Sequence, residues 1–226
     1  VIERIARSRG CRASVAGRDY SSSYDLPGRF SFRAEDQGAP LVLDDVPLGL
    51  RGRRQADNAA VATMLALELR RQGWLISAEA IQTGLAEAFL PGRIETIGDP
   101  PRAVMDVSHN VASAEALAEY LGEHHREQVR VLSFAATREK DVAGIARALL
   151  PLFERVIITQ HRQAARAVAA EDLAKVCRPI WNDLTPQRQP GSFQVAPDPT
   201  QAWHAATKSP LPGQLTCVAG SFFLAA

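Results

Sequence analysis

Several things that this sequence lacks narrow the possible functions before any motif is considered. The formal net charge is only +1 at pH 7 over 226 residues, so no excess of positive charge indicates a nucleic-acid partner. No apolar run is long enough for a transmembrane helix and no signal peptide opens the sequence, so we expect no membrane partner and a cytoplasmic protein. The three cysteines are far apart and odd in number, which excludes a complete disulfide framework and gives no metal-ligand spacing.

Lysine is also scarce, and its distribution bears on nucleotide binding. The basic residues are almost all arginine, and the only lysines are Lys140, Lys175 and Lys208. A phosphate-binding loop is a glycine-rich turn followed by lysine and serine or threonine, and the sequence contains no such turn. No GxGxxG follows any predicted strand either, which argues against a nicotinamide-dependent dehydrogenase.

The hydrophobic content, at 46%, is high enough to build a sizeable core. The first part of the chain shows helical spacing at residues 1–8, a polar and turn-rich stretch at residues 17–28, and two strand-like stretches near residues 29–34 and 40–44. Asn58 is predicted to cap a long helix that Gly73 ends. Because Val1 already lies in a predicted helix, we expect the chain to be part of a longer protein.

Ser77 is predicted to cap a further helix, after which Pro91 and Gly92 break the pattern. We therefore place a domain boundary there and expect domains at residues 1–90 and 91–226. From residue 103 onward, apolar strands alternate with helices. This alternation predicts an α/β fold, with a Rossmann-like, mostly parallel sheet and helices on both of its faces. Ligands bind such sheets outside the carboxyl ends of the strands.

The first strand of this alternating part ends in Asp106, and His109 and Asn110 follow at the start of a helix. The helix start and His109 could face a carboxylate while Asp106 faces an ammonium group. This arrangement would suit an amino-acid ligand. The ordinary alternative is that the acidic and amide side chains cap the helix and that the histidine is structural.

Polar or small residues also follow the other strands. Arg138 and Lys140 follow the second strand and could meet a phosphate. Arg166 follows the third strand, where it could clamp a carboxylate or remain a solvated surface charge. The last strand ends in Gly220 and Ser221. Small residues at this point either allow a ligand to approach the backbone or simply form a tight turn.

Two further residues are candidates for nucleotide binding: Asn58, before the proposed boundary, and Arg93, just after it. The amide of Asn58 could pair with a nucleotide base, although a capping role is the ordinary interpretation. Arg93 could reach a phosphate or lie exposed in solvent.

Each of these motifs is weak alone, but their order along the chain is specific. In sequence they are GRRQADNAAVA, ISAEAIQTGL, LPGRIE, MDVSHN, the KD after the second strand, the RA after the third strand, and CVAGSFF. This series resembles the dihydrofolate synthase / folylpolyglutamate synthase family of the Mur ligase superfamily. The resemblance runs from about Val1 to Phe223.

The resemblance implies an ATP-dependent ligase that joins glutamate to dihydropteroate or a folate through an acyl phosphate, with ATP and Mg²⁺ as cofactors. It implies that residues 1–90 are the C-terminal remnant of a central ATP-binding domain, and that residues 91–226 form the glutamate-ligase domain. Family members are commonly monomeric. Because the phosphate loop is absent and no lysine precedes Lys140, the chain alone is expected to be inactive.

The resemblance also carries roles to individual positions. Glutamate binding falls on Asp106, His109, Ser221 and, more loosely, Arg166. ATP binding falls on Asn58, Arg93 and again Asp106. No catalytic residue and no metal ligand of the family has a counterpart in this chain.

The chain departs from the family pattern at several places. Val107 and Ser108 stand where Gly-Ala is common, and Val111 stands where proline is common, so these larger residues are expected to crowd the turn. Arg54 replaces a common histidine, and Ala164-Ala165-Arg166 replaces Asn-Pro-Arg. A Mur-type peptidoglycan precursor ligase and a non-catalytic ligand-binding module derived from this family remain as alternatives.

Overall fold

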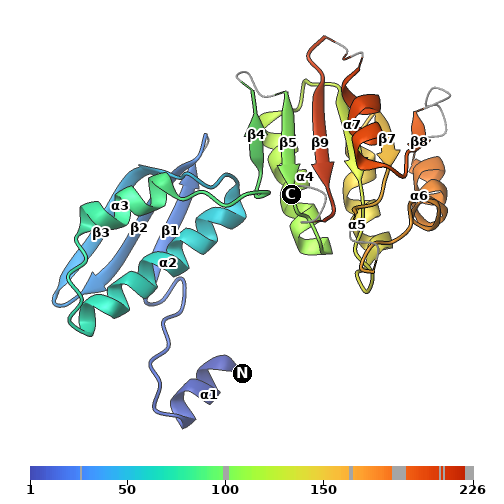
Figure 1. The fold of residues 1–226 in the computed structure, drawn as a ribbon. Coiled ribbons are helices and arrows are strands. Elements are labelled where there is room, and N and C mark those ends of the chain that lie inside the picture. Colours follow the sequence, from blue (N-terminus) through green and yellow to red (C-terminus); the bar gives the residue numbers. More distant parts are fainter. Residues whose placement is uncertain are drawn as a thin grey trace. The chain divides into compact units, whose positions relative to one another are not determined.

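The computed structural model describes residues 1–25, 27–98, 102–162, 165–184, 192–208, 210 and 212–221. The chain divides into two compact units, Val1–Phe89 and Leu90–Ala226 (Figure 1). Each unit has its own hydrophobic core. The division lies within two residues of the break in the sequence pattern at Pro91.

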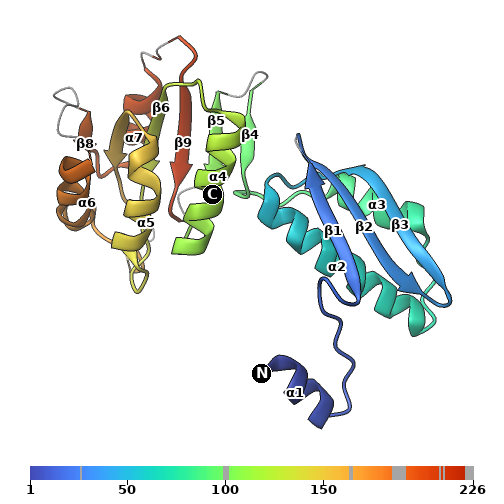
Figure 2. The ribbon, with the colours of Figure 1, turned by 180° about the vertical axis from the view of Figure 1, so that it is seen from behind.

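The first unit is a small antiparallel sheet with helices on one face. Its strands β1 (Tyr20–Asp25), β2 (Arg29–Asp36) and β3 (Ala39–Pro47) pair in that order. Helices α2 (Arg53–Arg71) and α3 (Ala78–Glu87) lie on the same face of the sheet, as the two opposite views show (Figures 1 and 2). The core forms where alternating residues of β2 and β3 meet the small and apolar side chains of the helices.

Two predictions for this unit are wrong. The stretch predicted to be turn-rich contains β1, a polar edge strand whose Tyr20 and Tyr24 are half-buried while its serines face solvent. Tyr20 stacks on Phe32 of the neighbouring strand, with 5.7 Å between ring centroids, so two aromatic contacts outweigh the polar composition. Helix α2 begins at Arg53 with Gly52 as its N-cap, so Asn58 lies inside the helix and does not cap it.

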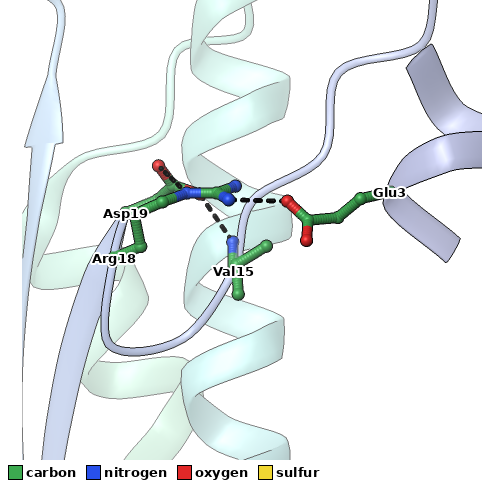
Figure 3. A network of polar contacts seen from close by, with 4 residues as sticks. All are labelled: Glu3, Val15, Arg18 and Asp19. Atoms are coloured by element: carbon green, nitrogen blue, oxygen red, sulfur yellow. Dashed lines mark hydrogen bonds and ion pairs between the residues drawn. The ribbon is translucent and has the colours of Figure 1, made fainter. Parts of the chain in front are cut away.

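Helix α1 (Ile2–Ser8) has no buried residue. A network of exposed polar contacts joins it to the turn before β1 (Figure 3). In this network Arg18 pairs with Glu3 at 2.6 Å and with Asp19 at 2.9 Å, and the backbone N–H of Val15 donates to Asp19. Ion pairs in solvent contribute little stability, so α1 is weakly held.

The second unit is the predicted Rossmann-like sheet, and this prediction is confirmed. Its order is β4-β5-β9-β6-β7-β8, and every neighbouring pair is parallel except β4 with β5. The strands are β4 (Glu95–Ile97), β5 (Ala103–Asp106), β6 (Arg130–Phe134), β7 (Arg155–Ile158), β8 (Phe193–Val195) and β9 (Leu215–Ala219). Since β9 inserts between β5 and β6, the chain order switches beside it.

Helices cover both faces of this sheet (Figures 1 and 2). On one face lie α4 (Val111–His124), α5 (Val142–Leu149), the short 3-10 helix η1 (Leu150–Leu152) and α6 (Ala170–Leu184), which together bury the main core. Helix α7 (Pro199–Thr207) packs on the other face through Ala202 and Ala206 against Val131 and Ile157. Within the residues that the structure describes, none of the helices has the length and apolar character needed to cross a membrane.

Candidate anion-binding site

A pocket of about 320 Å³ opens at the carboxyl edge of the parallel sheet, within the second unit. Its lining contains four basic side chains, one hydroxyl and several apolar groups. The lining residues are Leu90, Pro91, Arg93, Val107, His109, Thr137, Lys140 and Arg166. No acidic residue lines it among those that the structure describes. The pocket therefore favours a ligand that carries negative charge.

The turn between β5 and α4 places His109 in this pocket. Asn110 caps α4 by accepting a 2.9 Å hydrogen bond from the backbone N–H of Ser113, whose hydroxyl returns a bond to the carbonyl of Asn110. Ser108 adopts a positive φ of 30°, which lets its hydroxyl turn back to Asp106. Hence the serine that was expected to crowd the turn is part of its hydrogen bonding.

Asp106 is buried and is not among the residues that line the pocket. One carboxylate oxygen accepts from the backbone N–H of Ile94 at 3.0 Å, and the other accepts from the backbone N–H of Ser108 at 2.8 Å and from its hydroxyl. Burial raises the pKa of this carboxyl, and the hydrogen bonds from Ser108 and Ile94 oppose the rise. Asp106 thus ties β5 to Ile94, next to Arg93, and to the turn that carries His109.

Two loops pair side by side to bring Arg166 to the same edge. The backbone N–H of Arg138 donates to the carbonyl of Arg166 at 2.8 Å, and the N–H of Val168 donates to Ala136 at 3.0 Å. An isolated bridge between Thr137 and Ala167 lies between these bonds. The side chain of Arg138 is occupied by the carbonyl of Ala167, so Lys140 is the basic residue after β6 that lines the pocket.

Ser221 follows β9 at the same edge. Its hydroxyl lies 3.3 Å from that of Thr137, which does line the pocket. Gly220 has φ +104°, and a Cβ atom at this position would lie 2.0 Å from the carbonyl oxygen of Ala135. The glycine is therefore required by a close approach of the chain to itself, which corresponds to the tight-turn interpretation.

The surroundings of His109 favour an anionic ligand. Desolvation lowers the pKa of its imidazole, and the positive charges of Lys140 and Arg93 lower it further. Its buried Nδ1 atom finds no hydrogen-bond partner among the described residues. An imidazole that feels two positive charges, and whose buried Nδ1 has no partner among the described residues, favours a ligand that carries negative charge or a hydrogen-bonding group.

The predicted site residues fall into three groups. Arg93, His109 and Arg166 line the one pocket, whereas Asp106 and Ser221 do not line it. Asn58 belongs to the first unit, where its amide donates to Gln55 at 3.1 Å and it lines a separate apolar pocket. Ala164 and the phenylalanines of the CVAGSFF motif lie outside the described residues.

Thr137 and Lys140 line the pocket as well. Lys140 was expected only as a possible contact to a phosphate, and Thr137 was not predicted. The signal for Lys140 was its place after the second parallel strand, next to the capping residue Asp141. The signal for Thr137 was only that it follows the end of the same strand, which many threonines do without contacting a ligand.

Together, the fold and the pocket define an α/β domain with a positively charged pocket at the carboxyl edge of a parallel sheet. The chain belongs to the Mur ligase family, since the family described as "Mur ligase, glutamate ligase domain" matches residues 92–222, more than half of the sequence.

Among curated proteins, the chain is similar to dihydrofolate synthase/folylpolyglutamate synthase of Mycobacterium tuberculosis, with 34% identity over 143 residues, which cover 61% of this chain and 28% of that protein. It is also 27% identical over 195 residues to folylpolyglutamate synthase of Lacticaseibacillus casei, covering 86% of this chain and 41% of that one. The matched regions thus span less than half the length of these two relatives.

Solved structures agree with this grouping. The structure of Escherichia coli FolC in complex with DHPP and ADP has a TM-score of 0.79 and 26% identity, and covers 99% of this chain and 48% of its own. Mycobacterium tuberculosis folylpolyglutamate synthase complexed with ADP and AMPPCP has a TM-score of 0.80 and 25% identity, and covers 100% of this chain and 50% of its own.

Proposed function

We propose that this chain is the glutamate-binding part of an ATP-dependent ligase that joins glutamate to dihydropteroate or to a folate through an acyl-phosphate intermediate. In this proposal, Leu90–Ala226 forms the glutamate-ligase domain and Val1–Phe89 belongs to the ATP-binding domain. The observation that carries the proposal is the pocket at the sheet edge, which joins four basic side chains to a hydroxyl and has no acidic lining residue among those described.

The chemistry of the pocket suits the two carboxylates of glutamate. Lys140 and Arg166 supply fixed positive charge, and Arg166 can donate two parallel hydrogen bonds to one carboxylate. His109 can add a third positive group if it takes up a proton on binding. The hydroxyls of Thr137 and Ser221, held 3.3 Å apart, can donate or accept at the pocket wall.

The relatives support glutamate and nucleotide as ligands of the complete enzyme. One solved structure is described as a bifunctional folylpolyglutamate synthase/dihydrofolate synthase with Mn, AMPPNP and L-glutamate bound, and it shares the fold of this chain at 21% identity and a TM-score of 0.74. In our proposal, Arg93 contacts the phosphates of ATP and Asn58 contacts its base, as the family resemblance implies.

In our proposal, the magnesium site lies in a part of the complete enzyme that this chain does not cover. Among the residues that the structure describes, no three His, Cys, Asp or Glu side chains gather in a way that could hold a metal ion. The described part of the chain therefore offers no such cluster for Mg²⁺. The ATP-dependent step, with its phosphate loop and metal, belongs in our proposal to the part of the relatives that this chain does not cover.

The proposal is tested by titrating the complete chain with L-glutamate in a calorimeter. Substituting Lys140→Ala removes one charge-assisted hydrogen bond and should weaken binding about tenfold, equivalent to about 1.5 kcal/mol. The matched control is Lys208→Ala, which removes a lysine at the end of α7, where the chain returns toward the start of β9.

Unchanged affinity in the Lys208→Ala protein and weakened affinity in the Lys140→Ala protein are expected. Equal affinities in all three proteins, or no binding of glutamate to the parent chain at millimolar concentrations, would contradict the proposed role of this pocket.

A further inference from the structure

Two loops at the carboxyl edge of the parallel sheet carry basic side chains of the pocket. One loop follows β6 and carries Lys140, and the other follows β7 and carries Arg166. Lys140 is held by its own helix start, because its carbonyl accepts from the backbone N–H of Val142 at 2.8 Å and Asp141 caps α5. Arg166 lies between β7 and α6 and belongs to neither element. Its position therefore depends on contacts with the other loop.

The backbone pairing between the two loops is short. It consists of one hydrogen bond from Arg138 to the carbonyl of Arg166, one from Val168 to the carbonyl of Ala136, and an isolated bridge between them. Two paired segments of this length are only marginally stable without further support. A side-chain contact that ties the loops together would therefore fix the place of Arg166.

The side chain of Arg138 supplies such a contact. Its Nε–H donates to the carbonyl of Ala167 at 2.9 Å, while its backbone N–H donates to the carbonyl of Arg166 at 2.8 Å. We call these two hydrogen bonds to successive carbonyls the Arg138 clamp. Ala167 is buried, with 4% of its surface exposed, and the carbonyl groups of buried residues are nearly always paired. A bond from a charged donor is also stronger than one between neutral groups.

A buried histidine beside the pocket reports where the charge of Arg166 lies. Desolvation lowers the pKa of His161, which is 1% exposed, and the positive charge of Arg166 lowers this pKa further. Arg138 does not contribute to the shift, and it does not line the pocket. His161 therefore senses the position of Arg166 and not the charge of Arg138.

We propose that Arg138 is a positioning residue, whose clamp on the loop after β7 fixes Arg166 in the anion-binding pocket. This role deepens the proposed function and rests on it, because Arg166 is taken there to bind a carboxylate of glutamate. Arg138 acts through Arg166 and does not touch the ligand. An arginine that met the ligand with its own charge, or one that only stabilised the fold, would give different results in the experiment below.

Two substitutions separate the side-chain hydrogen bond of Arg138 from its charge. Arg138→Gln keeps an N–H donor as many bonds from the backbone as the arginine Nε, and it removes the charge. Arg138→Met has the same reach but neither the donor nor the charge. The clamp is therefore kept in the first variant and broken in the second. Because the side chain of Arg138 is exposed, both variants should keep the circular dichroism of the parent chain.

The position of Arg166 is measured without any ligand, by following the imidazole chemical shifts of His161 against pH. The pKa of His161 should be higher in Arg138→Met than in the parent chain, because Arg166 moves away from it, and unchanged in Arg138→Gln. Arg166→Ala should raise this pKa as well. Adding Arg138→Met to Arg166→Ala should cause no further rise, since the two residues act as one unit.

Calorimetry with L-glutamate gives the functional readout. The Arg138→Met chain should bind about fivefold more weakly than the parent chain, whereas the Arg138→Gln chain should bind within about twofold of it. In the Arg166→Ala background, Arg138→Met should have no further effect on the affinity.

Equal pKa values of His161 in the parent and Arg138→Met chains would overturn the positioning role, even if the parent binds glutamate, and would leave the proposed function intact. Equal weakening of glutamate binding by Arg138→Met and Arg138→Gln would overturn it too, because the charge of Arg138 would then act on the ligand directly. So would equal glutamate affinities of the parent and Arg138→Met chains. A parent chain that does not bind glutamate, with the His161 responses as expected, would refute the proposed function alone.

Discussion

Asp106 and His109 were expected to hold the two ends of an amino acid, but they occupy different layers of the site. Asp106 is buried and engaged by Ile94 and Ser108, whereas His109 lines the pocket. The Asp106 carboxylate therefore contributes to the site indirectly, by holding the turn that carries His109. Among the described residues, the pocket lining offers no acidic partner to an ammonium group, and its charge favours the acidic part of a ligand.

Binding of glutamate should strengthen as the pH falls from 7.5 to 5.5. In the free chain the pKa of His109 is lowered by desolvation and by Lys140 and Arg93, with only a small opposing effect of Asp106. A bound carboxylate raises this pKa, so the bound state holds more protons than the free state across the window. Affinity then rises as protons become available, by at most tenfold per pH unit for one group.

Calorimetry in buffers of different ionisation enthalpy measures this proton uptake. The carboxylates of glutamate do not titrate in that window, so they do not contribute to it. A His109→Gln variant should still bind but lose most of the pH dependence. If the parent and the variant share one pH profile, His109 does not respond to the ligand.

The sequence alone identified the polar residues that follow the parallel strands, but it could not show which of them line the pocket and which hold the surrounding loops. Arg93, His109 and Arg166 were named and do line one pocket. The burial of Asp106 was not predictable, because it depends on the backbone N–H of Ile94 twelve residues earlier. Arg138 and Lys140 looked equivalent until the loop pairing occupied Arg138.

At the scale of elements, the end of β9 depends on one glycine. Gly220→Ala places a Cβ atom against the carbonyl of Ala135 and Phe134 and also forces alanine into a positive φ. We expect a loss of about 2–4 kcal/mol in the free energy of unfolding, measured with urea. Glutamate binding should fall with it, because Ser221 and Thr137 move apart.

Gly213→Ala is the control, since Gly213 also has a positive φ but has no atom near the position of a Cβ. The Gly213→Ala substitution should lower the free energy of unfolding only by the backbone strain, about 1 kcal/mol. Equal losses in the two variants would mean that the close approach of β9 to β6 adds nothing to stability.

The alternation of apolar strands and helices after residue 103 predicted the parallel sheet because buried parallel strands are nearly continuous apolar runs. The antiparallel edge strand β4 has only three residues and was not predicted. Strand β1 was missed because its serines are typical of turns, and the start of α2 was misplaced because Asn58 is a strong capping residue in isolation. In the structure, aromatic contacts hold β1 in the sheet, and α2 begins at Arg53, five residues before Asn58.

At the scale of the whole molecule, the two units differ in how much apolar surface their helices leave exposed. Leu90–Ala226 has a sheet covered on both faces and a pocket at its carboxyl edge. In Val1–Phe89 the apolar side chains Val61, Leu65 and Leu69 of α2 are exposed, and α1, which has no buried residue, is joined to the turn before β1 by an exposed ion pair.

The most direct test of the proposed function is to map where L-glutamate binds on the complete chain of 24.5 kDa by amide chemical shifts in solution. Shifts should concentrate at the strand ends, on Val107, His109, Thr137, Lys140 and Ser221, and leave residues 20–87 unchanged. Shifts that are absent at saturating glutamate, or that cluster in residues 20–87, would contradict the claim that the sheet edge of the second unit is the glutamate site.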